Sequence, residues 1–393
     1  GLALLATPIA RAWNEATLAA TLPIMAPAVL LAPTTLVLVN ATIGAKVSRM
    51  SLYVRGLSEP LLLLTAVLVA ARLGGTLRSL AVAYVTTAAL VTALAVAACA
   101  RVFGASTLRR ALGSERHPSF IRFALPLGAS DLMGAILQKA DTFMVASFAG
   151  LDALAVYTAA EFVGRVIANP RYLFDYIIAP VISEALQVRD RARVRYNLAL
   201  MTRWAVTACL PIAVTVIVLR AEILGLYGAT FVAGKGPLVI LALHNLVTGC
   251  LGLTPYVVAM GGRSRVFMIN NACAAALNIA LGLVLIPRMG IWGAAIAVLV
   301  STVAFQVALT VEAWMFERVH PFTPALLKPL AAALVAFAVE HVLRASLAAG
   351  PARVTAVIGC GLISYLAALL ALGLAPEERE VARKLVGRLR GSG

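Results

Sequence analysis

Long apolar stretches follow one another along almost the whole chain, separated by short polar connections. Each stretch has about 20 residues, the length that an α-helix needs to cross a hydrocarbon core of roughly 30 Å. Residues 61–71 and 331–339 lack the alternation of apolar and polar positions that the strands of an outer-membrane barrel require. We therefore predict an all-α integral membrane protein with about eleven complete transmembrane helices. These helices are expected at residues 20–43, 57–72, 79–101, 119–148, 152–180, 197–220, 231–260, 266–286, 290–316, 324–345 and 353–375.

The composition agrees with this pattern. Hydrophobic residues make up 62% of the chain and charged residues only 13%, whereas about a quarter of the residues of a soluble domain are charged. The net charge of +16 and the pI near 10.3 would also suit a protein that binds nucleic acid. In a membrane protein, however, basic residues first report orientation, so their positions along the chain decide between the two interpretations.

The basic residues gather on one face when the predicted connections are assigned alternately to the two sides of the membrane. One face holds 21 of the 33 Lys and Arg residues and the opposite face holds 8, while the remaining four lie within predicted helices. Cytoplasmic loops are enriched in Lys and Arg, so the richer face is predicted to be cytoplasmic, in a bacterial cytoplasmic (inner) membrane. No nucleic-acid partner is expected. The cytoplasmic segments are 44–56, 101–118, 183–203, 261–265, 317–328 and the tail 376–393.

The two ends of the chain carry further predictions. The first complete helix begins on the outer face, so Gly1–Ala10 is expected to end an earlier helix and an N-terminal portion is expected to precede it; a cleaved signal sequence is the alternative. In the tail, Val381, Leu385 and Leu389 recur every four residues among basic ones, which predicts an amphipathic surface helix or, alternatively, a solvated tail. The five cysteines are scattered singly through apolar stretches, so no metal and no cofactor is predicted.

Charged residues at membrane depth are the most informative positions. Ionisable groups inside a membrane are costly and face either a partner or a polar cavity. Counting from the turn at 149–152 puts Lys139 and Asp141 at the depth of Glu161 and Arg165, which predicts pairing across this hairpin. Two interpretations stay open: ion pairs that fix the register of the helices, or side chains that line the path of a polar substrate. The candidate cavity residues are Asp131, Gln138, Lys139, Asp141, Glu161, Arg165, Arg171 and Asp175.

Uncharged polar residues follow in the predicted helix at 266–286. Asn278 lies two turns after Asn271, and amide oxygens together with a carboxylate such as Asp131 could hold a cation. Hydrogen bonds between helices are the alternative use of these asparagines. His244 is interpreted as an interior histidine.

Three stretches resemble a known superfamily. The first consists of FALPLG at 123–128, KADTFMV at 139–145 and FAGLDALAVYTAAE at 148–161; the second is YVVAMGGR at 256–263; the third is IPRMGIWGAAIA at 286–297, preceded by Asn278. Together they resemble the polysaccharide flippases of the MATE-like superfamily of multidrug, oligosaccharidyl-lipid and polysaccharide exporters.

The resemblance implies a two-bundle transporter with two extra C-terminal helices. It divides the chain into an incomplete N-terminal bundle at 1–118, a C-terminal bundle at 119–316, two additional transmembrane helices at 317–375 and the cytoplasmic tail at 376–393. The implied activity is alternating access, in which a polyprenyl-pyrophosphate-linked oligosaccharide passes from the cytoplasmic to the outer leaflet, coupled to Na⁺ or H⁺. The implied partners are that lipid-linked oligosaccharide, membrane lipids and polysaccharide polymerase machinery.

Two other functions remain as alternatives. A cation-coupled multidrug exporter of the same superfamily would use the acidic residues for cations and drugs. The charged candidates from Asp131 to Asp175 sum to −1, which departs from the cationic cavity that a pyrophosphate favours. A membrane glycosyl polymerase or ligase is weaker, because no outer connection is long enough to fold into a catalytic domain. The chain is therefore predicted not to be an enzyme.

Overall fold

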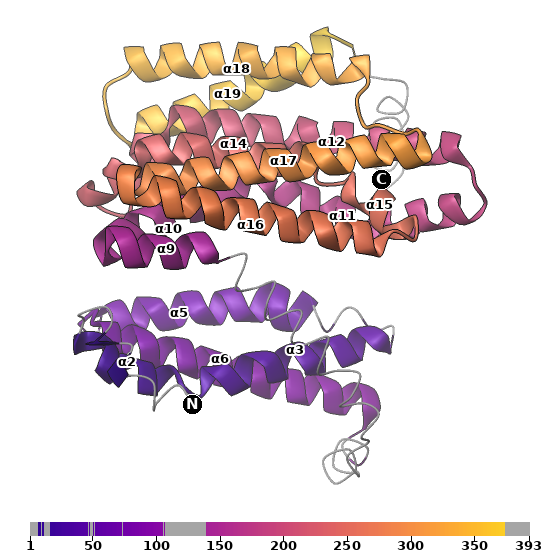
Figure 1. Cartoon of the computed structure of the whole chain (residues 1–393). Coiled ribbons are helices and arrows are strands. Elements are labelled where there is room, and N and C mark those ends of the chain that lie inside the picture. The colour runs from indigo at the N-terminus through magenta and orange to yellow at the C-terminus, as the bar shows by residue number, and fades with distance from the viewer. Residues whose placement is uncertain are drawn as a thin grey trace, which may run out of the picture. The chain divides into compact units, whose positions relative to one another are not determined.

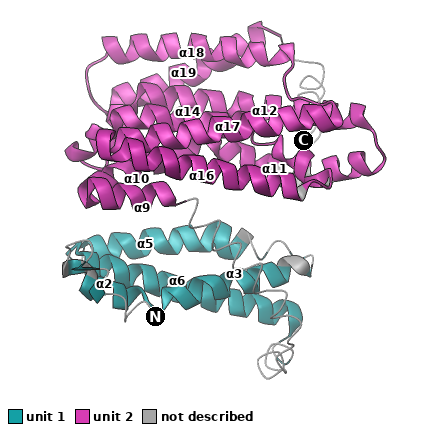
Figure 2. Cartoon of the chain, viewed as in Figure 1, with its two compact units in different colours: residues 1–128 teal, residues 129–393 magenta. Residues whose placement is uncertain are grey.

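The computed structural model describes residues 7–8, 10–11, 16–45, 47, 50, 52–72, 74–104, 106 and 139–373. Within these residues the regular structure is helical, as the apolar pattern predicted. The chain divides into two compact units, residues 1–128 and 129–393 (Figure 2). The predicted helix at 119–148 lies mostly outside the described residues, and the tail 376–393 lies wholly outside them.

The first unit is a small group of antiparallel helices (Figure 1). Helix α6 packs against each of the others, and Val39, Val54, Val91 and Ala95 form the buried core. The predicted helix at 20–43 is bent, because α2 and α3 are separated at Ala26 and Pro27. The elements of this unit are α2 (Ala16–Met25), α3 (Ala28–Gly44), the π-helical segment η1 (Leu52–Ser58), α5 (Glu59–Arg72) and α6 (Leu77–Phe103).

The second unit holds the larger bundle (Figure 1). Its middle part contains α9 (Ala140–Ala149), α10 (Leu151–Arg165), the 3₁₀ segment η2 (Val166–Ala168), α11 (Asn169–Gln187), α12 (Arg191–Val218), α13 (Arg220–Gly225), the 3₁₀ segment η3 (Ala229–Gly234) and α14 (Lys235–Leu251). The chain continues through α15 (Pro255–Met260), α16 (Ser264–Met289), α17 (Ile291–Glu317), the 3₁₀ segment η4 (Pro324–Leu326), α18 (Leu327–Ser346) and α19 (Pro351–Ala371).

Two of the expected helices are interrupted in this unit. The stretch predicted as one helix at 152–180 is α10, η2 and α11, with Pro170 in the first turn of α11. The stretch at 231–260 is η3, α14 and α15, and the break before α15 comes just ahead of Pro255. Proline has no backbone N–H and its ring clashes with the preceding turn, so it favours a new helix start over a continued one.

The helices α18 and α19 pack against each other, and α18 also packs along α12. Between these helices lies a separate apolar core that includes Val206, Leu210, Ala332, Val357 and Tyr365. The two helices predicted to be additional to the bundle are thus joined to it mainly through α12.

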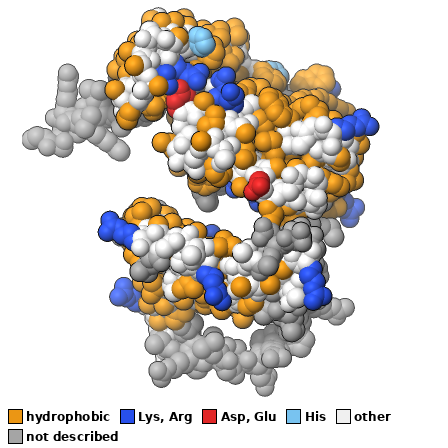
Figure 3. All heavy atoms as spheres, turned by 90° about the vertical axis from the view of Figure 1, so that its left-hand side faces the viewer, with side chains coloured by type: hydrophobic (Ala, Val, Ile, Leu, Met, Phe, Trp, Pro, Cys, Tyr) orange, Lys and Arg blue, Asp and Glu red, His pale blue; other side chains and the backbone are white. Residues whose placement is uncertain are grey.

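Large apolar side chains are exposed on the outside of the helices, including Leu334 at 71% and Ile363 at 68%. Figure 3 shows hydrophobic side chains spread over much of the face in view, with few charged side chains at separate places among them. Nine helices in the described residues are long and apolar enough to cross a membrane. They coincide with nine of the predicted spans, so the chain is a multi-pass membrane protein whose exposed apolar surface suits lipid.

Candidate substrate site

The hairpin of α9 and α10 brings the predicted charges together. The two helices are joined by Gly150 alone, whose φ of 86° lies in the left-handed region that a residue with a Cβ rarely adopts. Because the connection is so short, the start of α9 lies beside the end of α10. The turn thereby brings Lys139 next to Glu161, which follows it by 22 positions in the sequence.

Lys139, Glu161 and Arg165 form a three-residue cluster on this hairpin. The Nζ atom of Lys139 lies 3.3 Å from Oε1 of Glu161, and Nη2 of Arg165 donates to the same oxygen at 2.6 Å. The side chains of Lys139 and Arg165 are 46% and 51% exposed, while that of Glu161 is 19% exposed. The predicted pairing across the hairpin is therefore confirmed. Two cations share one carboxylate, so the cluster has an excess positive charge that an anionic group could neutralise.

Asp141 lies in the same hairpin but faces inward. It is 6% exposed, and its Oδ2 atom accepts a hydrogen bond of 2.6 Å from the hydroxyl group of Tyr157, which is fully buried. A buried carboxylate needs such a partner because it has lost its contact with water. In this structure Asp141 supports the hairpin from within, and its predicted place in the substrate cavity stays a prediction. Tyr157 was not predicted as its partner, although its position across the short turn could have indicated the contact.

Arg171 is placed by a break in another helix. Its Nη1 atom donates to the backbone oxygen of Gly252 at 2.9 Å, and its guanidinium group lies 4.7 Å from the centre of the Tyr172 ring. Gly252 follows the end of α14, and a Cβ on it would lie 2.7 Å from Cδ of Arg171. Arg171 thus caps a carbonyl group left free where α14 ends, a different setting from the cluster around Glu161.

The remaining cavity candidates lie outside what the structure describes. Asp131 and Gln138 are not among the described residues, and the side chain of Asp175 is not among the described side chains. Their proposed place in the substrate path stays a prediction.

The asparagines of α16 are used differently from one another. Asn270 donates to Oε2 of Glu312 on α17 at 2.6 Å, so one of these amides does join two helices. Asn271 is exposed, and the buried Oδ1 atom of Asn278 accepts no hydrogen bond from the described residues. A cation site built from Asp131, Asn271 and Asn278 stays a prediction, and the described residues contain no group of three or more His, Cys, Asp and Glu side chains that could hold a metal ion.

A charge network at the end of the bundle that holds α13 and the turn between α18 and α19 was missed in the sequence. Oε1 of Glu222 on α13 accepts from Nε of Arg344 at 2.9 Å and from Nη2 of Arg353 at 2.8 Å, which links α13 to both helices of the α18–α19 hairpin. Burial alone would raise the pKa of Glu222. The hydrogen bond and charge of Arg344 and the charge of Arg353 together lower it by more, so the pKa lies below its ordinary value. The partners are more than a hundred residues away in sequence, so spacing gave no signal.

A second missed residue is Glu340 on α18. It is 1% exposed, its Oε1 atom accepts from the hydroxyl group of Thr215 on α12 at 2.8 Å, and its Oε2 atom is buried with no hydrogen-bond partner in the described residues. The sequence shows Glu340 as a single acidic residue in an apolar stretch and does not indicate its neighbours. The packing of α12, α18 and α19 shows that it is buried.

The long apolar helices and their exposed apolar surface together define a polytopic membrane protein. Known proteins resemble part of its sequence and its fold. Residues 1–185 match the family described as polysaccharide biosynthesis protein. The search of curated proteins found no match. Among solved structures, the fold is similar to the lipid II flippase MurJ in its inward closed conformation, with a TM-score of 0.68, 14% sequence identity, and coverage of 89% of this chain and 73% of that one.

These two findings agree with the resemblance seen in the sequence. The chain has a MurJ-like transporter fold, and the family match and the fold together support a polysaccharide or lipid-linked flippase of the MATE-like type.

Proposed function

We propose that this protein flips a polyprenyl-pyrophosphate-linked oligosaccharide from the cytoplasmic to the outer leaflet of a bacterial inner membrane, with the C-terminus in the cytoplasm, and that it is a transporter and not an enzyme. The match to a polysaccharide biosynthesis family and the fold shared with a lipid II flippase support this substrate class. Alternating access, driven by Na⁺ or H⁺, is the mechanism that such a fold would use.

The observation that carries the proposal is the cluster of Lys139, Glu161 and Arg165. It combines exposed cationic groups with a shared carboxylate at membrane depth, where an unneeded charge would be costly. A pyrophosphate is an anion with several acceptor oxygens, and charge-assisted hydrogen bonds from Arg and Lys are the strongest that it can receive. The bound pyrophosphate would compete with Glu161 for Lys139 and Arg165. The ion pairs would position the two cations in the empty site and would be replaced by contacts with the substrate.

The net charge of the cluster differs from the sum over all candidate residues. Asp141 is turned inward to Tyr157, so its carboxylate does not face the same space as Lys139 and Arg165. The cluster of Lys139, Glu161 and Arg165 by itself carries a net charge of +1, which suits an anionic head group better than the sum of all candidate charges does.

The test is genetic and biochemical. The full-length gene is deleted, surface polysaccharide is measured, and the strain is complemented with the wild type, with Arg165→Ala, or with Arg265→Ala as a control that removes an exposed cation at the start of α16. Loss of one hydrogen bond between charged groups, worth about 1.5–3 kcal/mol, is expected to reduce export at low substrate by tenfold or more in Arg165→Ala. Expression of each variant is checked by immunoblot.

The outcomes separate the function from the site. Normal polysaccharide in the deletion strain would refute the flippase, and new drug sensitivity in that strain would favour the multidrug exporter. A defective deletion strain that Arg165→Ala restores as well as Arg265→Ala does would leave the flippase standing and remove the cluster from its substrate path.

A further inference from the structure

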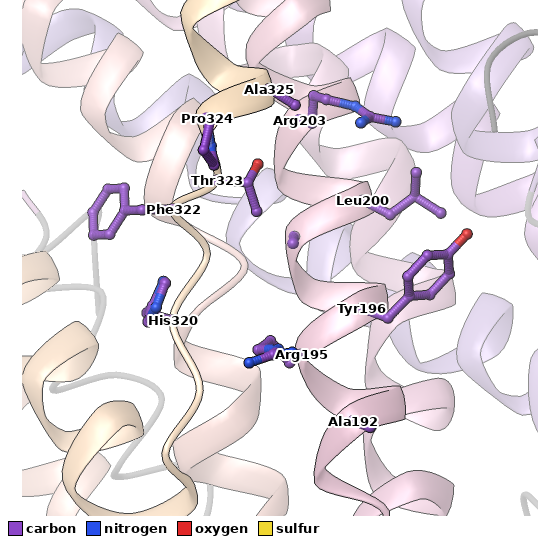
Figure 4. A pocket seen from close by; sticks show the side chains of 11 residues that line it. Ala192, Arg195, Tyr196, Leu200, Arg203, His320, Phe322, Thr323, Pro324 and Ala325 are labelled. Atoms are coloured by element: carbon purple, nitrogen blue, oxygen red, sulfur yellow. The ribbon is translucent and has the colours of Figure 1, made fainter. Parts of the chain in front are cut away.

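A basic pocket lies at the end of the bundle opposite to the Glu222 network, where α12 begins and α17 is connected to α18. Its volume is about 430 Å³. Figure 4 shows Arg195, Tyr196, Leu200 and Arg203 on α12 to one side, and the connection from His320 to Ala325 on the other, with the side chains of Arg195 and Thr323 in the space between. The positive-inside count places this end of the bundle in the cytoplasm.

The lining has a charged part and an apolar part. Arg195, Arg203 and His320 are basic or titratable, and no lining residue is acidic. Leu200, Phe322, Pro324, Ala325, Ala192 and Ala199 supply the apolar surface. Arg195 precedes Arg203 by two helical turns, about 12 Å at 1.5 Å per residue, so positive charge extends along the pocket.

The neighbouring arginines set Arg195 apart. On the same turn of α12, Arg191 pairs with Glu317 and Arg193 pairs with Glu184. No salt bridge in the described residues involves Arg195, although its side chain is exposed and directed into the pocket. An exposed cation next to two paired ones, at the boundary of the membrane, is suited to an anion from outside the chain.

We propose that this pocket binds the head group of an anionic phospholipid of the cytoplasmic leaflet. Basic pockets between transmembrane helices on the cytoplasmic side bind such head groups because phosphate oxygens meet Arg at close range and the acyl chains continue along apolar helix surface. Here Arg195 holds the phosphate, His320 and Arg203 add to the positive potential, and the acyl chains leave past Phe322, which is 52% exposed. The site is separate from the Glu161 cluster and does not depend on the proposed transport activity.

The experiment measures lipid binding to the purified full chain in detergent by native mass spectrometry. Dioleoylphosphatidylglycerol is titrated against dioleoylphosphatidylcholine, which has the same chains and no net charge. The wild type is expected to bind phosphatidylglycerol preferentially, and Arg195→Ala is expected to weaken that binding about fivefold, the usual contribution of one basic residue near an anionic surface. Arg195→Lys should keep most of the affinity because it keeps the charge.

Arg193→Ala is the matched control, since it removes an exposed arginine of the same helix outside the pocket lining. Equal binding of the two lipids by the wild type, or equal losses in Arg193→Ala and Arg195→Ala, would overturn the proposal. If phosphatidylglycerol binds only after Glu377, Glu378 and Glu380 are changed to Gln, the occupant is the acidic segment that follows Gly373 and not a lipid.

Discussion

Glycine at position 361 allows α19 to approach the buried carboxyl group of Glu340 on α18. A Cβ added at Gly361 would lie 2.5 Å from Cγ and 2.6 Å from Cδ of Glu340, and it would also overlap Oε1. Carbon atoms in favourable contact are about 3.5–4.0 Å apart, so Gly361→Ala cannot fit without movement. The Glu340 side chain cannot move freely, because it is 1% exposed and bound to Thr215.

The magnitude follows from three contributions. Forcing a methyl group into a packed interior costs about 1–3 kcal/mol. If Glu340 turns aside to make room, the hydrogen bond to Thr215 is lost, at about 1 kcal/mol. Alanine is favoured over glycine within a helix by up to about 1 kcal/mol, which offsets part of the loss. We therefore expect Gly361→Ala to destabilise the packing of α18 and α19 by about 1–3 kcal/mol.

The assay is thermal unfolding of the purified protein in detergent, followed by intrinsic tryptophan fluorescence. Each kcal/mol corresponds to roughly 2–4 °C in a chain somewhat smaller than this one, so a decrease of a few degrees in apparent Tm is expected. Gly359→Ala is the control, because it lies on the same helix with nothing within 4 Å of an added Cβ. The double variant Gly361→Ala with Glu340→Ala should lose less than the sum of the single variants. Equal Tm values for Gly361→Ala and Gly359→Ala would refute the reasoning.

Three further predictions concern other contacts. Glu222 has a pKa below its ordinary value of 4.5, so its stabilisation is present above that pH and is lost as the pH falls through the lowered pKa. In melting curves, the Tm advantage of the wild type over Glu222→Gln should therefore shrink as the pH falls below about 4.5. Tyr157→Phe removes the donor to buried Asp141 and should destabilise the protein by about 1.5–3 kcal/mol. Tyr157→Phe combined with Asp141→Asn should lower the stability by less than the sum of the two single variants, and additive losses would contradict the contact. Gly252→Ala should displace the Arg171 side chain and lower the Tm by several degrees, and an unchanged Tm would show that the break in the helix is not so tightly packed.

Most of the fold could be predicted from the sequence because a membrane constrains it strongly. A run of 20 apolar residues has few alternatives to a spanning helix, and the part of the chain that the structure describes contains nine such helices where they were expected. The interruptions in the helices at 152–180 and 231–260 were less predictable, because proline marks a weak point without fixing whether the helix bends or ends.

The candidate site was predictable only where its contacts are local. Glu161 and Arg165 are one turn apart, and Lys139 lies across a one-residue connection, so helical periodicity was enough to bring them together. Glu222 and Glu340 depend on how α12, α18 and α19 pack. That packing depends on many contacts, including those at small residues such as Gly361, and it cannot be inferred from the spacing of residues in the sequence.

The network around Glu222 also bears on how the last two helices enter the membrane. Arg344 and Arg353 flank the turn between α18 and α19, on the face that the charge count assigns to the outside. Carrying each positive charge outward against the membrane potential costs about 2.3 kcal/mol per 100 mV. Glu222 is synthesised 122 residues before Arg344, so under that assignment its carboxylate reaches the outer face before the turn does. We therefore expect Glu222 to favour the outward placement of the final hairpin.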